Sequence, residues 1–161
     1  PQSKYIGIDV SEESVNVAKE HHEKNGEFYV YDGKTINFDE NTFDTVFMAC
    51  VMHHIPLDYR ENTISECLRV LKEDGKLIIF EHNPLNPVTM KVVNTCPFDD
   101  DAILVRVRDL KKILKKHNVK MKVRYTIFLP RKGIFKHLLF LEKILFPIPL
   151  GGQYYVVIEK C

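Results

Sequence analysis

Two short apolar segments on either side of an amphipathic helix pattern constrain the fold of this chain most strongly. Residues 43–50 (FDTVFMAC) and 76–81 (KLIIFE) are predicted to be strands, and the first is apolar enough to be buried on both faces. Between them, residues 58–71 carry apolar side chains at helical spacing, namely Ile64, Cys67, Leu68 and Leu71. A strand, a helix and a second strand in this order are typical of a parallel sheet.

A similar unit precedes this one. Residues 5–8 are short, apolar and β-prone, and residues 28–31 form a second predicted strand, which the Asp32-Gly33 turn closes. Ser11 is placed to cap a helix that we expect to run to about residue 24. The alternation predicts an α/β fold with a parallel sheet and helices on both faces.

The remainder of the chain is less regular. We expect a long loop over residues 83–101, a basic helix over 108–117 and a strand over 119–129. A further helix is predicted over 133–146 and a final strand over 153–159. No crossover pattern separates the last two strands, so they are expected to pair antiparallel. No linker is visible, and the sequence therefore predicts a single domain over residues 1–161.

Composition narrows the range of functions. The 161 residues are 45% hydrophobic, which suits one compact core, and the net charge of +1 gives no reason to expect a nucleic-acid partner. The four cysteines form no C-x-x-C pair, so we expect reduced thiols and a cytoplasmic location, with Cys50 and Cys67 in the core. The apolar stretches are shorter than the ~20 residues that a membrane-spanning helix needs.

Several residues that can carry chemistry follow predicted strands. Asp9 is placed to accept hydrogen bonds from ribose hydroxyls in the crevice of a parallel sheet, or merely to cap the next helix. Asp32 can accept from an adenine amino group, and Gly33 allows a flat ring to approach the backbone. The alternative for this pair is an ordinary turn.

A histidine pair follows the third predicted strand. His53, His54 and His82 are candidate catalytic bases for a hydroxyl acceptor, and the small Ala49 and Cys50 leave room for a ligand. The alternative is that one histidine of the pair packs and the other caps the next helix. Because adjacent side chains on an extended chain point apart, we predict no metal site here. Glu81, at the end of the fourth strand, is either crevice-facing or a buried, paired carboxylate.

These segments resemble the class I S-adenosylmethionine-dependent methyltransferase family. The similar segments are YIGIDVSEESVNVAKE and FDTVFMACVMHHI followed by ISECLRVLKEDGKLII. The resemblance implies a Rossmann-like sheet, mostly parallel with a reversed C-terminal strand, and S-adenosylmethionine as cofactor. It assigns Asp9 to the ribose, Val10 to adenine packing, Asp32 and Gly33 to the adenine edge, and Ala49 and Cys50 to the methionine part.

The resemblance also leaves functional alternatives. The family's first strand and glycine-rich loop precede the segment where this sequence begins, so we expect an N-terminally incomplete domain with its first strand missing. The principal hypothesis is methyl transfer to a small-molecule or lipid-like acceptor. The alternatives are a non-catalytic scaffold or truncated fragment that does not bind cofactor, and a nicotinamide-dependent oxidoreductase, which the histidine pair disfavours.

Residues 131–146 are both basic and apolar. In a helix, Lys132, Lys136 and Lys143 would share one face, opposite Phe135, Leu138, Leu139 and Leu145. Such a surface suits peripheral membrane contact or the covering of an apolar substrate. The alternative, which we favour, is an ordinary lid that packs on the sheet.

Overall fold

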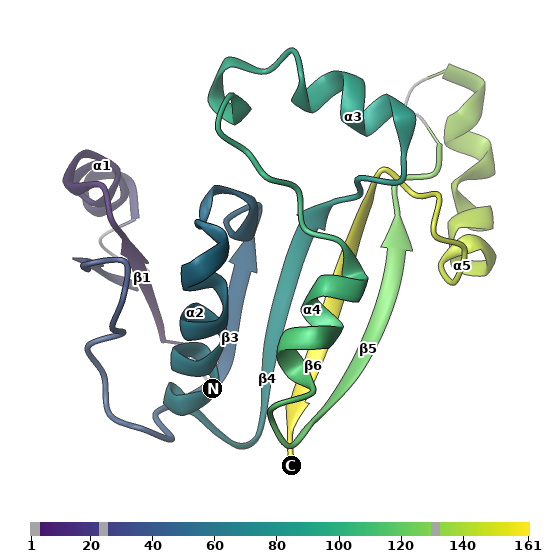
Figure 1. Cartoon of the computed structure of the whole chain (residues 1–161). Coiled ribbons are helices and arrows are strands. Elements are labelled where there is room, and N and C mark those ends of the chain that lie inside the picture. Colours follow the sequence, from purple (N-terminus) through teal and green to yellow (C-terminus); the bar gives the residue numbers. More distant parts are fainter. Residues whose placement is uncertain (1–3, 23–25, 130–132) are drawn as a thin grey trace. The chain divides into compact units, whose positions relative to one another are not determined.

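The computed structural model describes residues 4–22, 26–129 and 133–161 (Figure 1). The chain divides into two compact units, residues 1–39 and 40–161. In the smaller unit, β1 (Tyr5–Asp9) and β2 (Gly26–Val30) pair in parallel and are joined through α1 (Glu12–His22). Ser11 Oγ accepts a hydrogen bond from the backbone N–H three residues further on at 3.2 Å. The predicted strand–helix–strand unit with its serine cap is therefore confirmed.

The larger unit is built on a four-stranded sheet. Its order is β3 (Phe43–Ala49), β4 (Leu71–His82), β6 (Gln153–Lys160) and β5 (Val119–Thr126). β3 and β4 are parallel, whereas β6 runs antiparallel to both β4 and β5. The reversed C-terminal strand and the antiparallel pairing of the last two strands are both confirmed.

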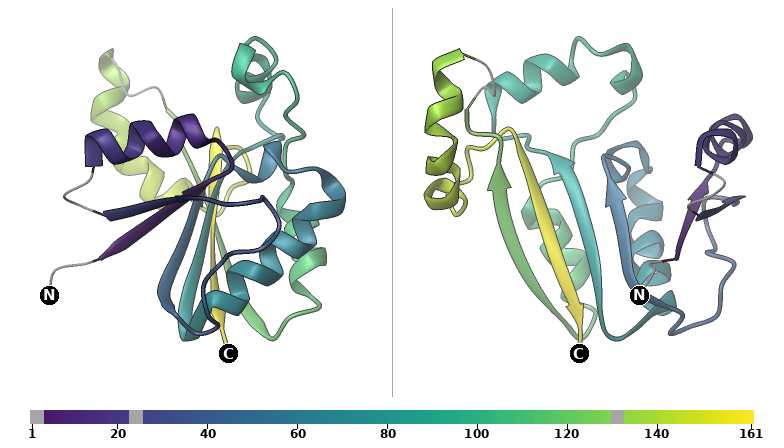
Figure 2. Two further views of the ribbon diagram at one scale, coloured as in Figure 1. Left: turned by 90° about the vertical axis from the view of Figure 1, so that its left-hand side faces the viewer. Right: turned by 180° about the vertical axis from the view of Figure 1, so that it is seen from behind.

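Two helices cover one face of this sheet, as both views of Figure 2 show. They are α2 (Leu57–Val70) and α4 (Val107–Leu114), and their inner side chains pack with alternate side chains of the strands. The buried apolar set comprises Ile64, Cys67, Leu68, Leu110, Leu114, Leu77, Ile79, Val156 and Ile158. Burial of this set is the main driving force for the folding of the unit.

The buried face of β4 ends in a charged residue. Side chains of a strand alternate between the two faces, so Leu77, Ile79 and Glu81 point the same way, and all three are 0% exposed. Glu81 thus extends the buried row of β4 up to the strand's carboxyl end. A carboxylate in that position requires hydrogen-bond partners, because burial without them is costly.

Two predictions about strands are wrong. β4 begins at Leu71 rather than at residue 76, and its pairing with β3 is irregular between Phe43 and Thr45. β3 is not buried on both faces, because it is an edge strand of the four-stranded sheet, and Phe47 is 61% exposed. Cys50, which follows β3, is only partly buried, whereas Cys67 lies in the core as predicted.

The expected loop over residues 83–101 instead contains α3 (Pro87–Val93) and the 3-10 turn η2 (Pro97–Asp99). The Asn86 side chain caps α3 by accepting hydrogen bonds from two backbone N–H groups at 2.9 and 3.0 Å. Proline at the first helical position needs no N–H partner there. The Asn-Pro step therefore initiates a helix here, in a segment that we expected to be a loop.

Residues 133–146 are helical but mostly as a 3-10 helix, η3 (Gly133–Leu141), followed by the short α5 (Glu142–Leu145). Lys132 and the side chains of Phe135 and Lys136 lie outside the described residues, so the predicted basic face remains a prediction. Among the residues that the structure describes, no helix has the length and apolar character needed to cross a bilayer.

Candidate functional site

At the end of β1, Asp9 is exposed and its Oδ1 accepts the backbone N–H of Ser11 at 2.8 Å. This bond orders the turn before α1, whereas the side chain that caps the helix is that of Ser11. A carboxylate has further acceptor capacity, because its two oxygens offer about four lone-pair sites. Asp9 is therefore able to accept the Ser11 N–H and to accept hydroxyl groups of a ligand at the same time.

The turn after β2 lies against the end of β1. Gly33 adopts a φ of +74°, in the left-handed region that glycine occupies without strain, and Val10 Cγ1 lies 3.3 Å from the position that a Cβ on Gly33 would take. Val10 is 63% exposed, so it offers an apolar surface beside this backbone. Asp32 Oδ1 accepts the N–H groups of Lys34 and Thr35 at 2.8 Å each, which lowers the pKa of Asp32. The hydrogen bonds to Asp32 thus order this turn, and the exposed side chain of Val10 leaves an apolar surface beside it.

In the larger unit, the backbone at the end of β3 is strained. Cys50 has a φ of +55°, which a residue with a Cβ rarely adopts, and its N–H donates to Phe80 O of β4 at 2.8 Å. Ala49, one residue earlier, is exposed. The strand therefore ends in a tight bend that the pairing with β4 holds in place.

The histidine pair lies on the 3-10 turn η1 (Met52–His54) rather than on extended chain. His53 is buried, and its Nδ1 lies 2.6 Å from Glu81 Oε2, while Glu81 Oε1 accepts the backbone N–H of Met52 at 2.8 Å. Burial alone would lower the pKa of His53, but the hydrogen bond and charge of Glu81, with Asp99, outweigh it and raise the pKa. Of the two alternatives for Glu81, the structure shows the buried, paired carboxylate.

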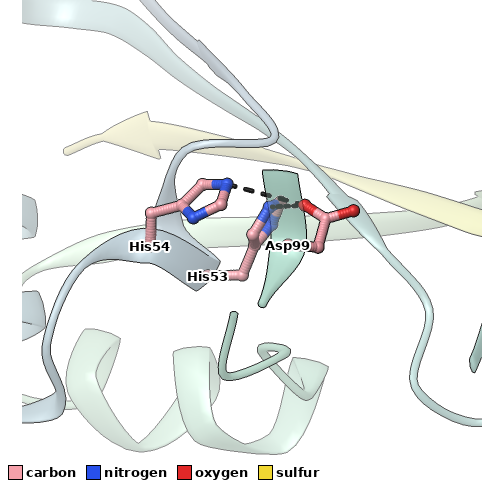
Figure 3. Close-up of side chains that lie close together, drawn as sticks. All are labelled: His53, His54 and Asp99. Atoms are coloured by element: carbon pink, nitrogen blue, oxygen red, sulfur yellow. Dashed lines mark ion pairs between the residues drawn. The ribbon is translucent and has the colours of Figure 1, made fainter. Parts of the chain in front are cut away.

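The turn brings both histidines to one aspartate, as Figure 3 shows. His53 Nε2 lies 3.5 Å and His54 Nε2 3.7 Å from Asp99 Oδ1, and His54 Nδ1 lies 3.1 Å from Asp101 Oδ1. The premise that these side chains point apart is wrong, because a 3-10 turn places successive residues about 120° apart rather than on opposite faces. His54 does not cap α2, since no side chain caps that helix.

His82 completes the cluster. Its ring centroid lies 5.3 Å from that of His53, and its Nδ1 lies 3.4 Å from the Nε2 of Gln153 on β6. Burial lowers the pKa of His82, and the neighbouring His53 lowers it further, so this imidazole is neutral at neutral pH. The three candidate histidines are therefore together in the structure, and the pKa values of His53 and His82 are shifted in opposite directions.

A buried arginine, which the sequence analysis did not single out, holds the turn η1 in place. Arg60 of α2 donates to the carbonyl oxygens of Ile55 at 2.9 Å and Ile103 at 2.6 Å, and it is 5% exposed. Ile103 N in turn donates to His53 O at 2.9 Å. Arg60 lies four residues before the buried Ile64, so the helical spacing signalled that it faces the core. Asp99 was also missed, because nothing local links it to the histidine pair.

The chain is similar to known methyltransferases. Residues 2–79 match the methyltransferase domain family. The chain is 34% identical over 86 residues to demethylmenaquinone methyltransferase of Thermotoga maritima, covering 53% of this chain and 36% of that protein. It is 33% identical over 75 residues to the ubiquinone/menaquinone biosynthesis C-methyltransferase UbiE of Ectopseudomonas mendocina, covering 46% of this chain and 28% of that protein. The chain thus spans about a third of the length of these curated relatives.

Solved structures share the fold. One is a SAM-dependent methyltransferase of Thermotoga maritima described as a possible histamine N-methyltransferase, with a TM-score of 0.73 and 16% identity over 96% of this chain and 72% of that one. Another is a SAM-dependent methyltransferase of Methanosarcina mazei, with a TM-score of 0.68 and 17% identity over 99% of this chain and 82% of that one. At these identities, the likeness shows the Rossmann-like fold alone.

Proposed function

We propose that the chain takes part in methyl transfer from S-adenosylmethionine to a small, lipid-like acceptor, because residues 2–79 match the methyltransferase domain family and the fold is that of SAM-dependent methyltransferases. S-adenosylmethionine is the cofactor of this family. Its sulfonium carries an already activated methyl group, so the protein mainly supplies binding, alignment and exclusion of water. The observation that carries the proposal is the arrangement of Asp9, Val10 and Gly33 in the smaller unit.

These residues fit the nucleoside part of the cofactor. The exposed Asp9 carboxylate has room for ribose hydroxyls beside its bond to Ser11, and Val10 offers an apolar surface for adenine. Gly33 lets a flat ring approach the backbone, and Asp32 retains acceptor capacity for an amino group. The assignment of Ala49 and Cys50 to the methionine part remains a prediction from the resemblance.

Titration of the chain with S-adenosylmethionine in a calorimeter tests the cofactor part. Asp9→Asn keeps an acceptor for the Ser11 N–H but removes the charge, so we expect binding to weaken about 10-fold or more. Glu20→Ala, which removes another exposed carboxylate of the same unit, is the matched control. Equal affinity of Asp9→Asn and the unsubstituted chain would contradict the assignment. No binding at all would favour the non-catalytic scaffold.

An exposed apolar surface supports a lipid-like acceptor. Val88 and Val92 of α3 are 69% and 58% exposed, and Leu150 is 59% exposed. The Asn86 side chain donates to Leu150 O at 2.7 Å, so these side chains belong to neighbouring segments. Exposed apolar groups that gather in one region are typical of sites that bind apolar ligands. Two of the relatives are quinone-pathway enzymes by name, which agrees with an apolar acceptor.

Methylation assays with two acceptors test the acceptor class. Demethylmenaquinone and histamine correspond to the names of two similar proteins, and we expect turnover of the apolar quinone only. Val88→Lys combined with Val92→Lys should raise the KM for the quinone without altering cofactor binding. Turnover of histamine instead of the quinone would overturn the lipid-like assignment.

We also propose that His82 is the base when the acceptor is a hydroxyl. Burial lowers the pKa of His82, which favours the form that accepts a proton, whereas Nδ1 of His53 is engaged by Glu81 and Nδ1 of His54 by Asp101. His82→Gln should therefore lower kcat at least 100-fold, by removal of a general base. His54→Gln, at the exposed position, is the comparison, and an equal loss in both variants would contradict the choice of His82.

A further inference from the structure

The described part of the chain brings three potential metal ligands together in the larger unit. His53, His54 and Asp99 each offer one ligand atom, and these atoms all lie within 4.8 Å of one another. Figure 3 shows both imidazole rings directed toward the Asp99 carboxylate, which comes from η2. The nearest contacts are His53 Nε2 to Asp99 Oδ1 at 3.5 Å and His54 Nε2 to the same oxygen at 3.7 Å.

In both His53 and His54, the other ring nitrogen, Nδ1, lies close to a second carboxylate. Glu81 Oε2 lies 2.6 Å from Nδ1 of His53, and Asp101 Oδ1 lies 3.1 Å from Nδ1 of His54. Each Nδ1 is thus held by a carboxylate, which leaves the Nε2 atoms of both rings turned toward Asp99 Oδ1. Metal-binding histidines have this same arrangement, with the outer nitrogen held by a carboxylate.

The spacing of the ligand atoms suits a tetrahedral ion. Bonds from zinc to imidazole nitrogen and carboxylate oxygen are about 2.0–2.2 Å long, which places neighbouring ligand atoms of a tetrahedral ion about 3.3–3.6 Å apart. The two distances to Asp99 Oδ1, 3.5 and 3.7 Å, are within a few tenths of an ångström of that edge. Only small side-chain rotations are therefore needed for all three atoms to reach one ion.

We propose that His53, His54 and Asp99 form a binding site for a first-row divalent transition metal, with zinc as the probe ion. Two imidazoles and one carboxylate favour zinc and its neighbours over magnesium or calcium, which prefer all-oxygen sites. Glu81 and Asp101 are positioning residues that orient the two rings. Three protein ligands leave the fourth position of a tetrahedral ion open to water or to an oxygen atom of a ligand.

The site is reachable from solvent. The side chain of His54 is 38% exposed and that of Asp99 13%, whereas His53 is 1% exposed. An ion can therefore enter on the His54 side and reach the buried His53. The proposal goes beyond methyl transfer, because a sulfonium methyl donor needs no metal, and it does not depend on cofactor binding.

Calorimetric titration of the chain with zinc chloride, without S-adenosylmethionine, tests the site. We expect one zinc per chain, with affinity reduced at least 100-fold in His54→Ala and in Asp99→Asn, because each removes a ligand. Asp101→Asn should cost about 10-fold or more, the usual effect of an outer carboxylate. The matched control is His21→Ala with His22→Ala, which removes an exposed pair of adjacent histidines on α1.

Cobalt substitution gives a second readout. Co²⁺ in a four-coordinate site should produce visible absorption bands that disappear in His54→Ala, while circular dichroism shows that the variant remains folded. Zinc binding that is absent, or that persists in both His54→Ala and Asp99→Asn, would overturn the proposal. So would binding lost only in the His21/His22 control. The cluster would then be an ion-pair network in which a protonated His53 bridges Glu81 and Asp99.

Discussion

His53 Nδ1 lies 2.6 Å from Glu81 Oε2, and both side chains are almost completely buried. The pair joins the turn after β3 to the end of β4, and the second Glu81 oxygen holds the Met52 N–H. Two elements separated by α2 are thus fixed to each other at a single carboxylate. The stability and shape of the histidine cluster therefore depend on Glu81.

Replacement of Glu81 should be among the most damaging changes in the chain. Glu81→Ala leaves His53 Nδ1 and the Met52 N–H buried without an acceptor, so we expect a loss of about 3–5 kcal/mol in the free energy of unfolding. Glu81→Gln keeps an acceptor for the Met52 N–H and should cost less. Glu159→Ala, which removes an exposed pair with Lys122 at 3.4 Å, should cost below about 1 kcal/mol in the same urea titration. A loss in Glu81→Ala as small as that of Glu159→Ala would contradict the buried-pair interpretation.

We predict that lysine cannot replace Arg60 without a loss of stability. Its guanidinium spans the carbonyl oxygens of Ile55 and Ile103, and the single ammonium group of lysine lacks that fork geometry. We expect Arg60→Lys and Arg60→Leu each to lower the free energy of unfolding by about 2–4 kcal/mol, measured by urea denaturation. Arg108→Leu, on an exposed surface of α4, should change it by no more than about 0.5 kcal/mol. If lysine restored full stability, charge alone would explain the role of Arg60.

Glycine should be preferred at position 50. Because Cys50 has a φ of +55°, Cys50→Gly removes a strained conformation, whereas Cys50→Val adds a β-branched side chain to it. We expect melting temperatures in the order Gly, Ala, Val from highest to lowest at this position. The same substitutions at Ala49, which lies in β3, should show the ordinary strand preference with valine above glycine. Valine above glycine at position 50 as well as at position 49 would indicate that Cys50 is not strained.

Cys67 should make the stability of the protein fall at high pH. Burial raises the pKa of this thiol from 9.0 to about 12. Between these values the unfolded chain loses the proton while the folded chain keeps it, so the stability contribution is complete below about pH 9 and is lost as the pH rises toward 12. The slope is at most about 1.4 kcal/mol per pH unit.

The test compares the chain with Cys67→Ala by urea denaturation at several pH values. The difference in the free energy of unfolding should be constant below pH 9 and should shrink above it, since alanine does not titrate. Cys161→Ala, which removes an exposed thiol of the same chain, is the matched control. A constant difference between the chain and Cys67→Ala across the whole pH range would refute the raised pKa.

Local patterns predicted most of the fold. Two strands and one helix were predicted correctly, from the apolar runs at residues 43–50 and 76–81 and from the spacing of Ile64, Cys67 and Leu68. Such predictions succeed because the periodicity of strands and helices depends on residues that are close in the sequence. The helix after Asn86 was missed, although asparagine before proline is a helix-start signal. The prediction of a loop over residues 83–101 did not take this capping chemistry into account.

The candidate site was predicted less completely. Asp9 and Gly33 follow strands directly, so their positions could be inferred from the order of elements. Asp99 lies 46 residues after His53, and only the tertiary structure brings the two together. The relation between the histidines also depended on a 3-10 turn, whose short length leaves no periodic signal.

The place of β6 has a consequence for synthesis on the ribosome. Residues 153–160 are made after β4 and β5, yet they lie between these two strands in the finished sheet. While residues 153–160 are still inside the exit tunnel, β5 has no neighbour in the sheet and one edge of β4 is open. The nascent chain must therefore keep two unpaired strand edges apart until this segment has left the tunnel, and a chaperone would be of most use during that interval.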